Sequence, residues 1–230
     1  MKRVIDITLS GFGLFIFLPI ILVLILLIWV QDQRSPFYKA PRVGKDHKTF
    51  IMYKLRTMKV DADKSGVEST SIDDGRITKL GKLIRTSKMD EISQLWNVLM
   101  GNMSLVGPRP NTLNGVKDYT ELENKLLSIK PGITDLSSIV FSDEGAILEG
   151  SRDPDDLYNK IIRPWKSKLG ILYVEKHNPF LDIFILICTC LAILNKRLAL
   201  IVVNKLLLFL NSEEKLIELC KRDKDLIDFI

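Results

Sequence analysis

Cysteine and histidine are scarce in this chain of 230 residues, which has three cysteines and two histidines. No two cysteines form a CxxC pair, so the sequence predicts neither a disulfide framework nor a structural zinc site, and packing is their expected role. His47 and His177 have no partner at the spacing of a metal site or a catalytic triad. Thiol, zinc or histidine-base chemistry is therefore not indicated.

A glycine-rich phosphate loop of the GxxxxGK type is also missing, and there are no heptads or short repeats. ATP-driven chemistry is therefore unsupported. The formal charge of +5, from 33 basic and 28 acidic side chains, suits either nucleic acid or an anionic membrane leaflet. Because the aromatic platforms and recognition motifs of nucleic-acid binding are missing, we expect no nucleic-acid partner.

A long apolar run covers Ile7 to Val30 near the N-terminus. As a straight helix it would reach about 36 Å, enough to span a bilayer. Pro19 lies in its middle, where it removes a helix hydrogen bond, and basic residues flank both ends, which draws both ends to the cytoplasm. The residues thus leave a full span and a re-entrant helix open. A secretory signal is excluded because the run is too long and no small-residue cleavage site follows.

Further apolar segments lie near the C-terminus. Pro179 to Leu194 would form a helix of about 24 Å, too short for a comfortable span, so we expect it to lie in the membrane interface. Leu198 to Leu210 adds another apolar patch. Ser212 to Ile230 is a charged amphipathic tail that either pairs with another subunit or stays solvated.

The middle of the chain predicts little strand. Pro36 to Met58 indicates two short strands around a turn at Gly44 to Asp46, and Val116 to Ile129 indicates a helix. Asp61 to Gly75, rich in Asp, Ser and Gly, predicts a mobile surface loop that either closes over substrate or has no role, and a loop without a role is the preferred interpretation. A polar loop containing Asp143 and Glu144 precedes a helix that approaches Tyr173. These two carboxylates either touch the substrate or belong to a solvated loop, and the solvated loop is the preferred interpretation.

Two adjacent carboxylates, Asp90 and Glu91, are the most informative residues of the chain. Apolar residues follow at helical spacing and predict one buried stripe made of Ile92, Leu95, Trp96 and Leu99. The carboxylates would then lie at a helix N-terminus, where anions such as phosphate are favoured. Taken alone, Ser87 and Asp90 also suit a capping box with no catalytic content.

Basic residues accompany the acidic pair in sequence. Arg85 and Lys88 flank it on the N-terminal side, and a second cluster comprises Lys54, Arg56 and Lys59. The turn at 107–110 holds one guanidinium, Arg109, between Pro108 and Pro110, which stiffen the backbone. Together these features indicate a polyanionic substrate and a metal ion.

These segments resemble the bacterial sugar transferase family, the small monotopic phosphoglycosyl transferases that act on polyprenol phosphate. The resemblance is carried by FYKAPRVGKDHKTFIMYKLRTM, by RITKLGKLIRTSKMDEISQLWNVLMGNMSLVGPRP and by KPGIT. It implies a mostly helical α+β fold with short strands and an N-terminal re-entrant membrane helix broken at Pro19. The implied organisation is a membrane helix (1–34), a cytoplasmic catalytic domain (35–178), interfacial apolar helices (179–210) and a charged tail (211–230).

The resemblance also implies a reaction and its residues. A phosphosugar would pass from a UDP-sugar to undecaprenyl phosphate at the bacterial cytoplasmic membrane, with the catalytic domain facing the cytoplasm and UMP released. Asp90 would be the nucleophile that carries the phosphosugar, and Glu91 a ligand of Mg²⁺. Further active-site and substrate-binding positions would be Lys54, Arg85, Arg109, Arg56, Pro108 and Pro110.

Two departures from the commoner family pattern bear on this expectation. Ser93 stands where many members have proline, and the run 135–144 replaces a glycine followed by an AQV-like sequence. The second change leaves the identity of the donor sugar open. The alternative function is a catalytically inactive, membrane-anchored scaffold, but such a protein would be expected to lose Asp90, Glu91 or Arg109. A homo-oligomer is compatible with the sequence.

Overall fold

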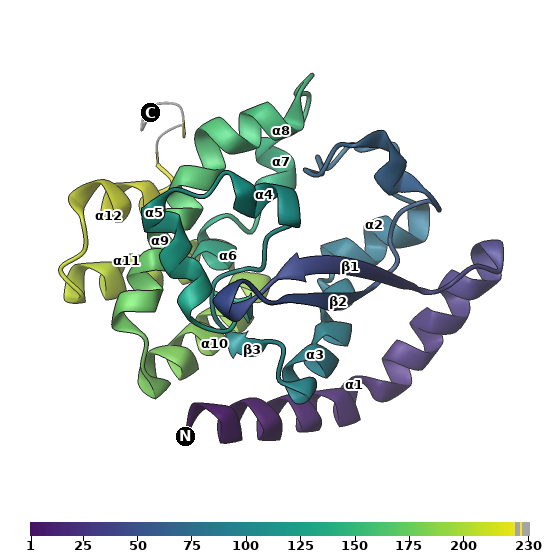
Figure 1. Ribbon diagram of the computed structural model, residues 1–230, viewed down its shortest axis with the longest axis horizontal. Helices are drawn as coiled ribbons and strands as arrows, with labels where there is room; N and C mark the ends of the chain where they lie inside the picture. The colour runs from purple at the N-terminus through teal and green to yellow at the C-terminus, as the bar shows by residue number, and fades with distance from the viewer. Residues whose placement is uncertain (224–225, 227–230) are drawn as a thin grey trace.

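A computed structural model describes residues 1–223 and 226 of the chain. Helices predominate, and the strands form two separate two-stranded sheets (Figure 1). In chain order the elements are α1 (Lys2–Asp32), β1 (Phe37–Val43), η1 (Lys45–His47), β2 (Thr49–Leu55), η2 (Ala62–Ser65), α2 (Lys79–Thr86), η3 (Met89–Gln94), α3 (Leu95–Met100), β3 (Ser104–Val106), α4 (Leu113–Lys117), α5 (Glu121–Asn124), η4 (Lys125–Ser128), β4 (Gly132–Thr134), α6 (Leu136–Val140), α7 (Glu144–Ile147), α8 (Pro154–Leu157), η5 (Tyr158–Ile162), α9 (Arg163–Lys176), α10 (Pro179–Leu194), α11 (Lys196–Phe209) and α12 (Glu214–Lys221).

The antiparallel hairpin β1–β2 confirms the two predicted strands. Phe37 pairs with Leu55 at one end and Val43 with Thr49 at the other. The turn contains two residues with positive φ, Asp46 and His47, and Asp tolerates this conformation better than most residues. The hairpin presents Lys54 near its open end, and this position matters for the site described below.

The second sheet is parallel and joins β3 to β4, with Ser104 opposite Gly132 and Val106 opposite Thr134. The KPGIT segment thus ends in a strand. Backbones approach closely here: the amide of Gly132 donates to the carbonyl of Pro108 at 3.0 Å, and a Cβ on Gly132 would lie 2.1 Å from the Gly107 nitrogen. Only glycine allows this approach, which holds the turn that carries Arg109.

Replacing Gly132 with alanine is therefore expected to destabilise the fold by about 2–3 kcal/mol, because the clash is with backbone atoms that cannot rotate away. Denaturant unfolding measures the change. Gly75→Ala is the matched control, since a Cβ there meets nothing within 4 Å. Equal stability of the two variants would contradict this account of the β3–β4 contact.

One hydrophobic core joins the hairpin and the C-terminal helices. It runs from Ala40 to Leu226 and includes the fully buried Tyr173 of α9. The helix predicted to approach Tyr173 is confirmed, as are the helices in 179–194 and 198–210. The helical stretch expected near Val116 to Ile129 is confirmed in part, because the structure has three short helices there in place of one: α4, α5 and η4.

The C-terminal helices each bury one face in this core. In α10, Leu181, Ile185 and Cys188 are buried, whereas the opposite face exposes Phe180 and Ile187. The charged tail was expected to be solvated or to pair with another subunit, but within the described residues its apolar face packs inward through Leu216, Leu219 and Cys220 of α12. Residues 224–225 and 227–230 of that prediction lie outside the described residues. Packing is confirmed as the role of Cys188 and Cys220.

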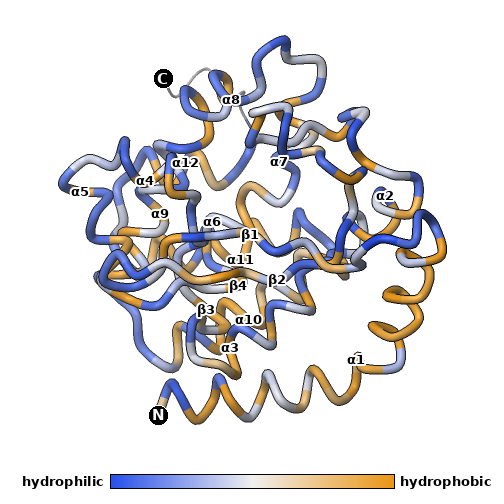
Figure 2. Tube along the Cα trace, turned by 45° about the vertical axis from the view of Figure 1, so that its right-hand side comes forward, coloured by the Kyte–Doolittle hydropathy of each residue, from blue (hydrophilic) through white to orange (hydrophobic). Residues whose placement is uncertain are grey.

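The N-terminal helix α1 is long and apolar enough to cross a membrane. It continues through Pro19 as one helix and curves past α3 (Figure 1), so the predicted break is not confirmed. Figure 2 shows the apolar character of most of its length. Both of its ends are tied to the rest of the chain: Lys2 Nζ lies 2.7 Å from Asp182 Oδ2, and Asp32 Oδ2 lies 2.6 Å from Arg56 Nη1.

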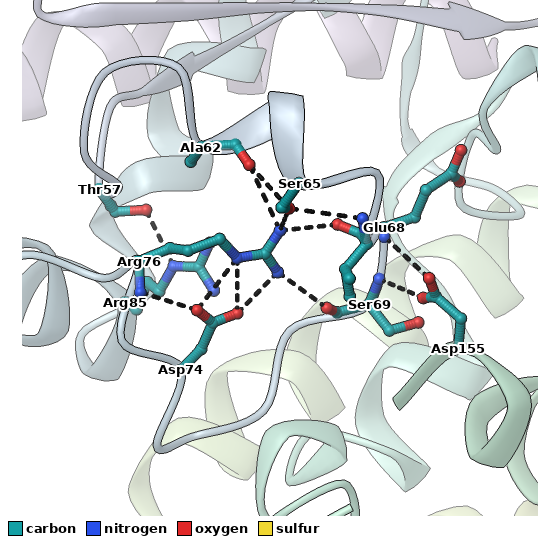
Figure 3. Close-up of polar contacts among 10 residues, drawn as sticks. Thr57, Ala62, Ser65, Glu68, Ser69, Asp74, Arg76, Arg85 and Asp155 are labelled. Atoms are coloured by element: carbon teal, nitrogen blue, oxygen red, sulfur yellow. Dashed lines mark hydrogen bonds and ion pairs between the residues drawn. The ribbon is translucent and has the colours of Figure 1, made fainter. Parts of the chain in front are cut away.

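Segment 61–75, expected to be a mobile loop without a role, is held by many polar contacts (Figure 3). Arg76 forms a bidentate pair with Asp74 and donates to the carbonyls of Val67 and Ser69 at 2.8 and 3.2 Å. The carboxylate of Asp155 on α8 accepts from the Ser69 amide at 2.6 Å. The segment lies at the surface as expected, but several of its polar groups are bonded to one another and to α8.

Hydrogen bonds from Arg76 lower the pKa of Asp74 below its usual value. A carboxyl with a lowered folded-state pKa adds stability above its unfolded pKa of 3.8, and that stability is lost as the pH falls through the lower, folded value. Asp74→Asn is therefore expected to cost about 2 kcal/mol at pH 7 and less below pH 3.8. Denaturant unfolding across pH measures this, with the exposed Asp73→Asn as control. A pH-independent difference would contradict it.

Candidate active site

Asp90 and Glu91 lie in the 3₁₀-helix η3, which leads directly into α3. Lys88 precedes them with φ 56°, a left-handed conformation that turns the chain sharply between α2 and η3. The capping-box interpretation is wrong, because the Ser87 hydroxyl donates back to the carbonyls of Leu83 and Ile84. The carboxylates are therefore free to serve another role.

The predicted apolar stripe on this helix is confirmed only in part: Leu95 packs against the hydrophobic core, but the fully buried apolar residue is Val98, which the stripe did not include. Polar residues share the buried face: Asn97 Nδ2 donates to the Ile51 carbonyl at 2.6 Å, the Tyr53 amide donates to Asn97 Oδ1 at 3.0 Å, and Ser93 Oγ donates to the Tyr53 carbonyl at 3.1 Å. Trp96 is 52% exposed instead. These bonds fix η3 and α3 along the strand β2 that carries Lys54. Ser93, one of the departures from the family pattern, thus acts as a hydrogen-bond donor to β2.

The structure brings both carboxylates to the ammonium group of Lys54. Lys54 Nζ lies 3.6 Å from Asp90 Oδ2 and 3.4 Å from Glu91 Oε1. Arg109 Nη2 lies 2.6 Å from the same Glu91 oxygen, so three chain segments meet here. The Asp90 residue is only 7% exposed. A carboxylate buried beside an ammonium group is one of the side chains that can act as a nucleophile toward phosphorus.

The charges of Glu91 and Arg109 shift each other's pKa. Burial opposes the ionisation of Glu91, but Arg109 and Lys54 outweigh it and hold the pKa of Glu91 well below its usual value. Glu91 in turn raises the pKa of Arg109. Both groups therefore remain charged at neutral pH, which suits a site for phosphate groups and metal ions.

Arg85 also lies close to the acidic pair. Its Nε donates to Thr57 Oγ1 at 2.9 Å (Figure 3), and burial lowers its pKa while the nearby charge of Asp90 opposes that shift. Arg56 lies elsewhere: it pairs with Asp32 at the end of α1, with two N–O distances of 2.6 Å. Pro108 and Pro110 flank Arg109 and line a small cavity with Tyr119.

Mg²⁺ is the metal that the family resemblance implies, and the donor chemistry suits it. Glu91 Oε2 makes only a 3.4 Å contact with Arg109 Nη1, so this hard oxygen keeps lone pairs for a cation. Among the described residues, no group of three or more His, Cys, Asp or Glu side chains forms a metal cage. This agrees with Mg²⁺ sites that use one or two carboxylates and complete the shell with phosphate oxygens.

Comparison with known proteins decides the family. A family model described as bacterial sugar transferase matches residues 1–196. The chain belongs to the bacterial sugar transferase family. The match covers α1, the hairpin, the acidic pair and the Arg109 turn, and so confirms the resemblance expected from the sequence motifs.

Three relatives illustrate the range of the family. The exopolysaccharide production protein PSS of Rhizobium leguminosarum bv. phaseoli is 33% identical over 207 residues, which cover 85% of this chain and 96% of that protein. The uncharacterized sugar transferase EpsL of Bacillus subtilis (strain 168) is 35% identical over 189 residues, covering 82% of this chain and 85% of EpsL. The UDP-glucose:undecaprenyl-phosphate glucose-1-phosphate transferase of Klebsiella pneumoniae is 31% identical over 191 residues, covering 82% of this chain.

The family therefore includes proteins much longer than this one. The present chain spans 39% of the Klebsiella protein and less than two thirds of several other relatives. The part of the chain that the family model matches, residues 1–196, contains the acidic pair and its cations.

Proposed function

We propose that this protein transfers a phosphosugar from a UDP-sugar to undecaprenyl phosphate, and that Asp90 carries the phosphosugar between the two substrates. The observation that supports this most strongly is the buried Asp90 carboxylate within reach of Lys54, next to the Glu91–Arg109 pair. The name of the Klebsiella relative describes a reaction of this class.

The proposed reaction has two displacements at phosphorus. An oxygen of Asp90 attacks the β-phosphorus of the donor, a new P–O bond forms, and UMP leaves with the electron pair of the bond that breaks. An oxygen of undecaprenyl phosphate then attacks the same phosphorus, which frees the Asp90 carboxylate and yields undecaprenyl-diphosphate-sugar. The two substrates never need to be bound together.

The cations around Asp90 serve charge stabilisation. Lys54 and Arg109 are placed to neutralise the phosphate oxygens, and Arg85 supports the same region from α2. Glu91, freed from part of its contact with Arg109, would hold Mg²⁺. When bound, that ion would supply charge neutralisation on the phosphate oxygens of the departing UMP.

The lipid substrate requires the site to lie at a membrane surface, and α1 supplies the anchor in this proposal. Because Lys2 and Asp32 at its two ends both contact the catalytic part of the chain, the helix would enter and leave the same leaflet. Its outward face is apolar, and exposed apolar side chains continue from it onto neighbouring elements, among them Phe12, Phe15, Leu22, Leu26, Trp96 and Met100.

Labelling in sealed vesicles tests this topology. Single cysteines placed at Met1 and at Gln33, in a chain whose native cysteines are replaced, are expected to react with a membrane-impermeant reagent from the same side. The exposed Asp156, changed to cysteine, marks the side of the catalytic part. Labelling of Met1 and Gln33 from opposite sides would instead establish a full span.

Turnover with defined substrates tests the reaction. Purified protein in detergent is incubated with undecaprenyl phosphate and each of a set of UDP-sugars, and released UMP is measured. We expect release with at least one donor and dependence on the lipid for continued turnover. A correctly folded protein that releases no UMP with any donor would favour the alternative of a non-catalytic membrane scaffold.

A further inference from the structure

Arg3 and Lys130 place two positive charges side by side where the N-terminal end of α1 meets the end of α3 (Figure 1). A Cβ on Gly101, the residue that ends α3, would lie 3.3 Å from Arg3 Nη2 and 3.6 Å from Lys130 Nζ. Like charges at this range repel each other, and a bound anion would relieve the repulsion. The proposed reaction uses neither residue of this Arg3–Lys130 pair.

Hydrogen bonds hold the Arg3 guanidinium in place but leave part of it for a ligand. Its Nη1 donates to the Val98 carbonyl at 2.5 Å and its Nη2 donates to the Leu99 carbonyl at 2.7 Å, both near the C-terminal end of α3. A cation is favoured at this end of a helix. Because each terminal nitrogen of a guanidinium carries two N–H groups, both nitrogens keep one donor for another acceptor.

The protein does not balance the charge of this pair. Within the described part of the chain, no carboxylate forms an ion pair with Arg3 or Lys130. Asp6 is buried, and its Oδ1 accepts from the Ser104 hydroxyl and the Leu105 amide at 3.0 Å each. The Asp6 carboxylate is thus bound to β3, and the pair keeps an excess of positive charge.

Lys45 brings a third positive charge toward Lys130. It begins η1, the turn of the hairpin, and η1 packs against η4, which lies just before Lys130 in the chain. Burial lowers the pKa of Lys130, and the charges of Arg3 and Lys45 lower it further, while Asp6 opposes them. The direction of this shift agrees with the geometry, in which Lys130 lies among other cations.

Exposed apolar side chains accompany the Arg3–Lys130 pair. Met100, which precedes Gly101, is 63% exposed, and Val4, which follows Arg3, is 66% exposed. Ile7, one turn beyond Arg3 on α1, is also exposed. These residues continue the apolar outward face through which α1 is proposed to anchor the protein. The pair therefore lies at the edge of that face, at the level where basic side chains meet lipid headgroups.

The Arg3–Lys130 pair is remote from the acidic pair. From Asp90 the chain runs through η3 and α3 to Gly101, and the rise per residue of these helices gives about 18 Å. A phosphate bound at Gly101 is therefore out of reach of the Asp90 carboxylate. It would be a phosphate that stays in place, as in a phospholipid of the membrane, and not that of an acceptor that undergoes transfer.

We infer that Arg3 and Lys130, with Lys45 close by, form a binding site for the phosphate of an anionic phospholipid. One headgroup would then fix both the N-terminal end of α1 and the loop before β4 to the membrane surface. A guanidinium and an ammonium group both donate charge-assisted hydrogen bonds to phosphate oxygens. The position of the site at the membrane surface rests on the proposed role of α1, whereas binding itself requires no turnover.

Lipid retention in native mass spectrometry tests the site. The purified protein in detergent is mixed with equal amounts of phosphatidylglycerol and phosphatidylcholine, which both carry a phosphate but differ in net charge, and the adducts of each lipid are measured. We expect the wild type to prefer phosphatidylglycerol at least about tenfold. Lys130→Gln is expected to lower this preference about fivefold, because each cation near an anionic lipid surface contributes about that factor.

Lys160→Gln is the matched control. It removes the same charge beside α8, which lies on the opposite side of the molecule from α1 (Figures 1 and 2), and it is expected to keep the wild-type preference. Lys130→Arg keeps the charge and is expected to keep the preference too, which separates a loss of charge from a loss of packing. Because Arg3→Gln also removes the bonds to α3, Lys130→Gln is the variant that decides.

Competition identifies the ligand. Undecaprenyl phosphate at an equal amount, or inorganic phosphate in excess, is added to the mixture, and phosphatidylglycerol adducts are expected to persist in both cases. Loss of these adducts to undecaprenyl phosphate would assign the site to the acceptor, and loss to inorganic phosphate would indicate a site for the ion alone. Either result overturns the inference.

Equal retention of the two phospholipids by the wild type, or an unchanged preference in Lys130→Gln, also overturns it. These measurements contain no donor sugar and no turnover. A protein that releases no UMP in the turnover assay therefore contradicts the proposed reaction and leaves the lipid site standing, whereas a protein that turns over without a preference for phosphatidylglycerol contradicts the lipid site alone.

Discussion

Replacing Asp90 with asparagine is expected to reduce UMP release at least about a thousandfold and to abolish the covalent phosphosugar adduct. An amide is nearly the same size as the carboxylate, so the Lys54 contact at 3.6 Å and the fold around it are disturbed little. The amide cannot form the acyl phosphate that the proposed reaction requires. The loss is therefore expected in the chemical step and not in donor binding.

Incubation with a donor labelled in the sugar, without lipid acceptor, measures this directly. Intact-protein mass spectrometry should find one phosphosugar on the wild type, and peptide mapping should place it on Asp90. Asp156→Asn is the control, since it changes an exposed carboxylate that pairs with Lys160 on the surface of α8. Label on Glu91, or an adduct on the Asp90→Asn variant, would show that the nucleophile is another group.

Removal of Mg²⁺ is expected to stop turnover completely and reversibly. Without the cation, Glu91 remains in its 2.6 Å contact with Arg109, and the charge on the phosphate oxygens of the departing UMP is left to Lys54 and Arg109 alone. These two are insufficient in this proposal because a nucleoside diphosphate binds Mg²⁺ as part of its own charge balance.

The assay compares turnover in excess chelator with turnover in the same chelator saturated beforehand with Mg²⁺. A second readout is binding: Mg²⁺ is expected to raise the thermal midpoint of the protein with bound UDP-sugar, and to do so less in Glu91→Gln. An unchanged rate in excess free chelator would remove the metal from the reaction, and an unchanged shift in Glu91→Gln would remove Glu91 as its ligand.

Periodicity in the sequence located helices better than it oriented them. The hairpin and the helices α10 and α11 were predicted from apolar runs and turn residues, and the structure has them. The stripe after the acidic pair was confirmed only in part because an apolar residue faces either a protein core or a lipid phase, and spacing does not distinguish the two. Trp96 is exposed, whereas Asn97 is buried by its two bonds to β2.

Composition likewise did not predict the partners of the polar side chains in segment 61–75 or the partner of Glu144. Segment 61–75 is rich in polar residues, and Glu144 lies in a polar loop. Such a composition usually indicates contact with water. In the structure these groups find protein partners that are distant in sequence: Asp155 accepts from Ser69, and Lys166 pairs with Glu144. A polar side chain has the same appearance in sequence whether its partner is water or a distant residue.

What the sequence by itself determined is the local chemistry of the site: an acidic pair, Asp90 and Glu91, and a guanidinium held by prolines at Arg109, in an order typical of one enzyme family. Only the tertiary structure decided which charges meet. It pairs Glu91 with Arg109 across 18 positions, Arg56 with Asp32, and Glu144 with Lys166. Local bonding depends on neighbours along the chain, whereas these contacts depend on how the packed helices and the hairpin bring distant segments together.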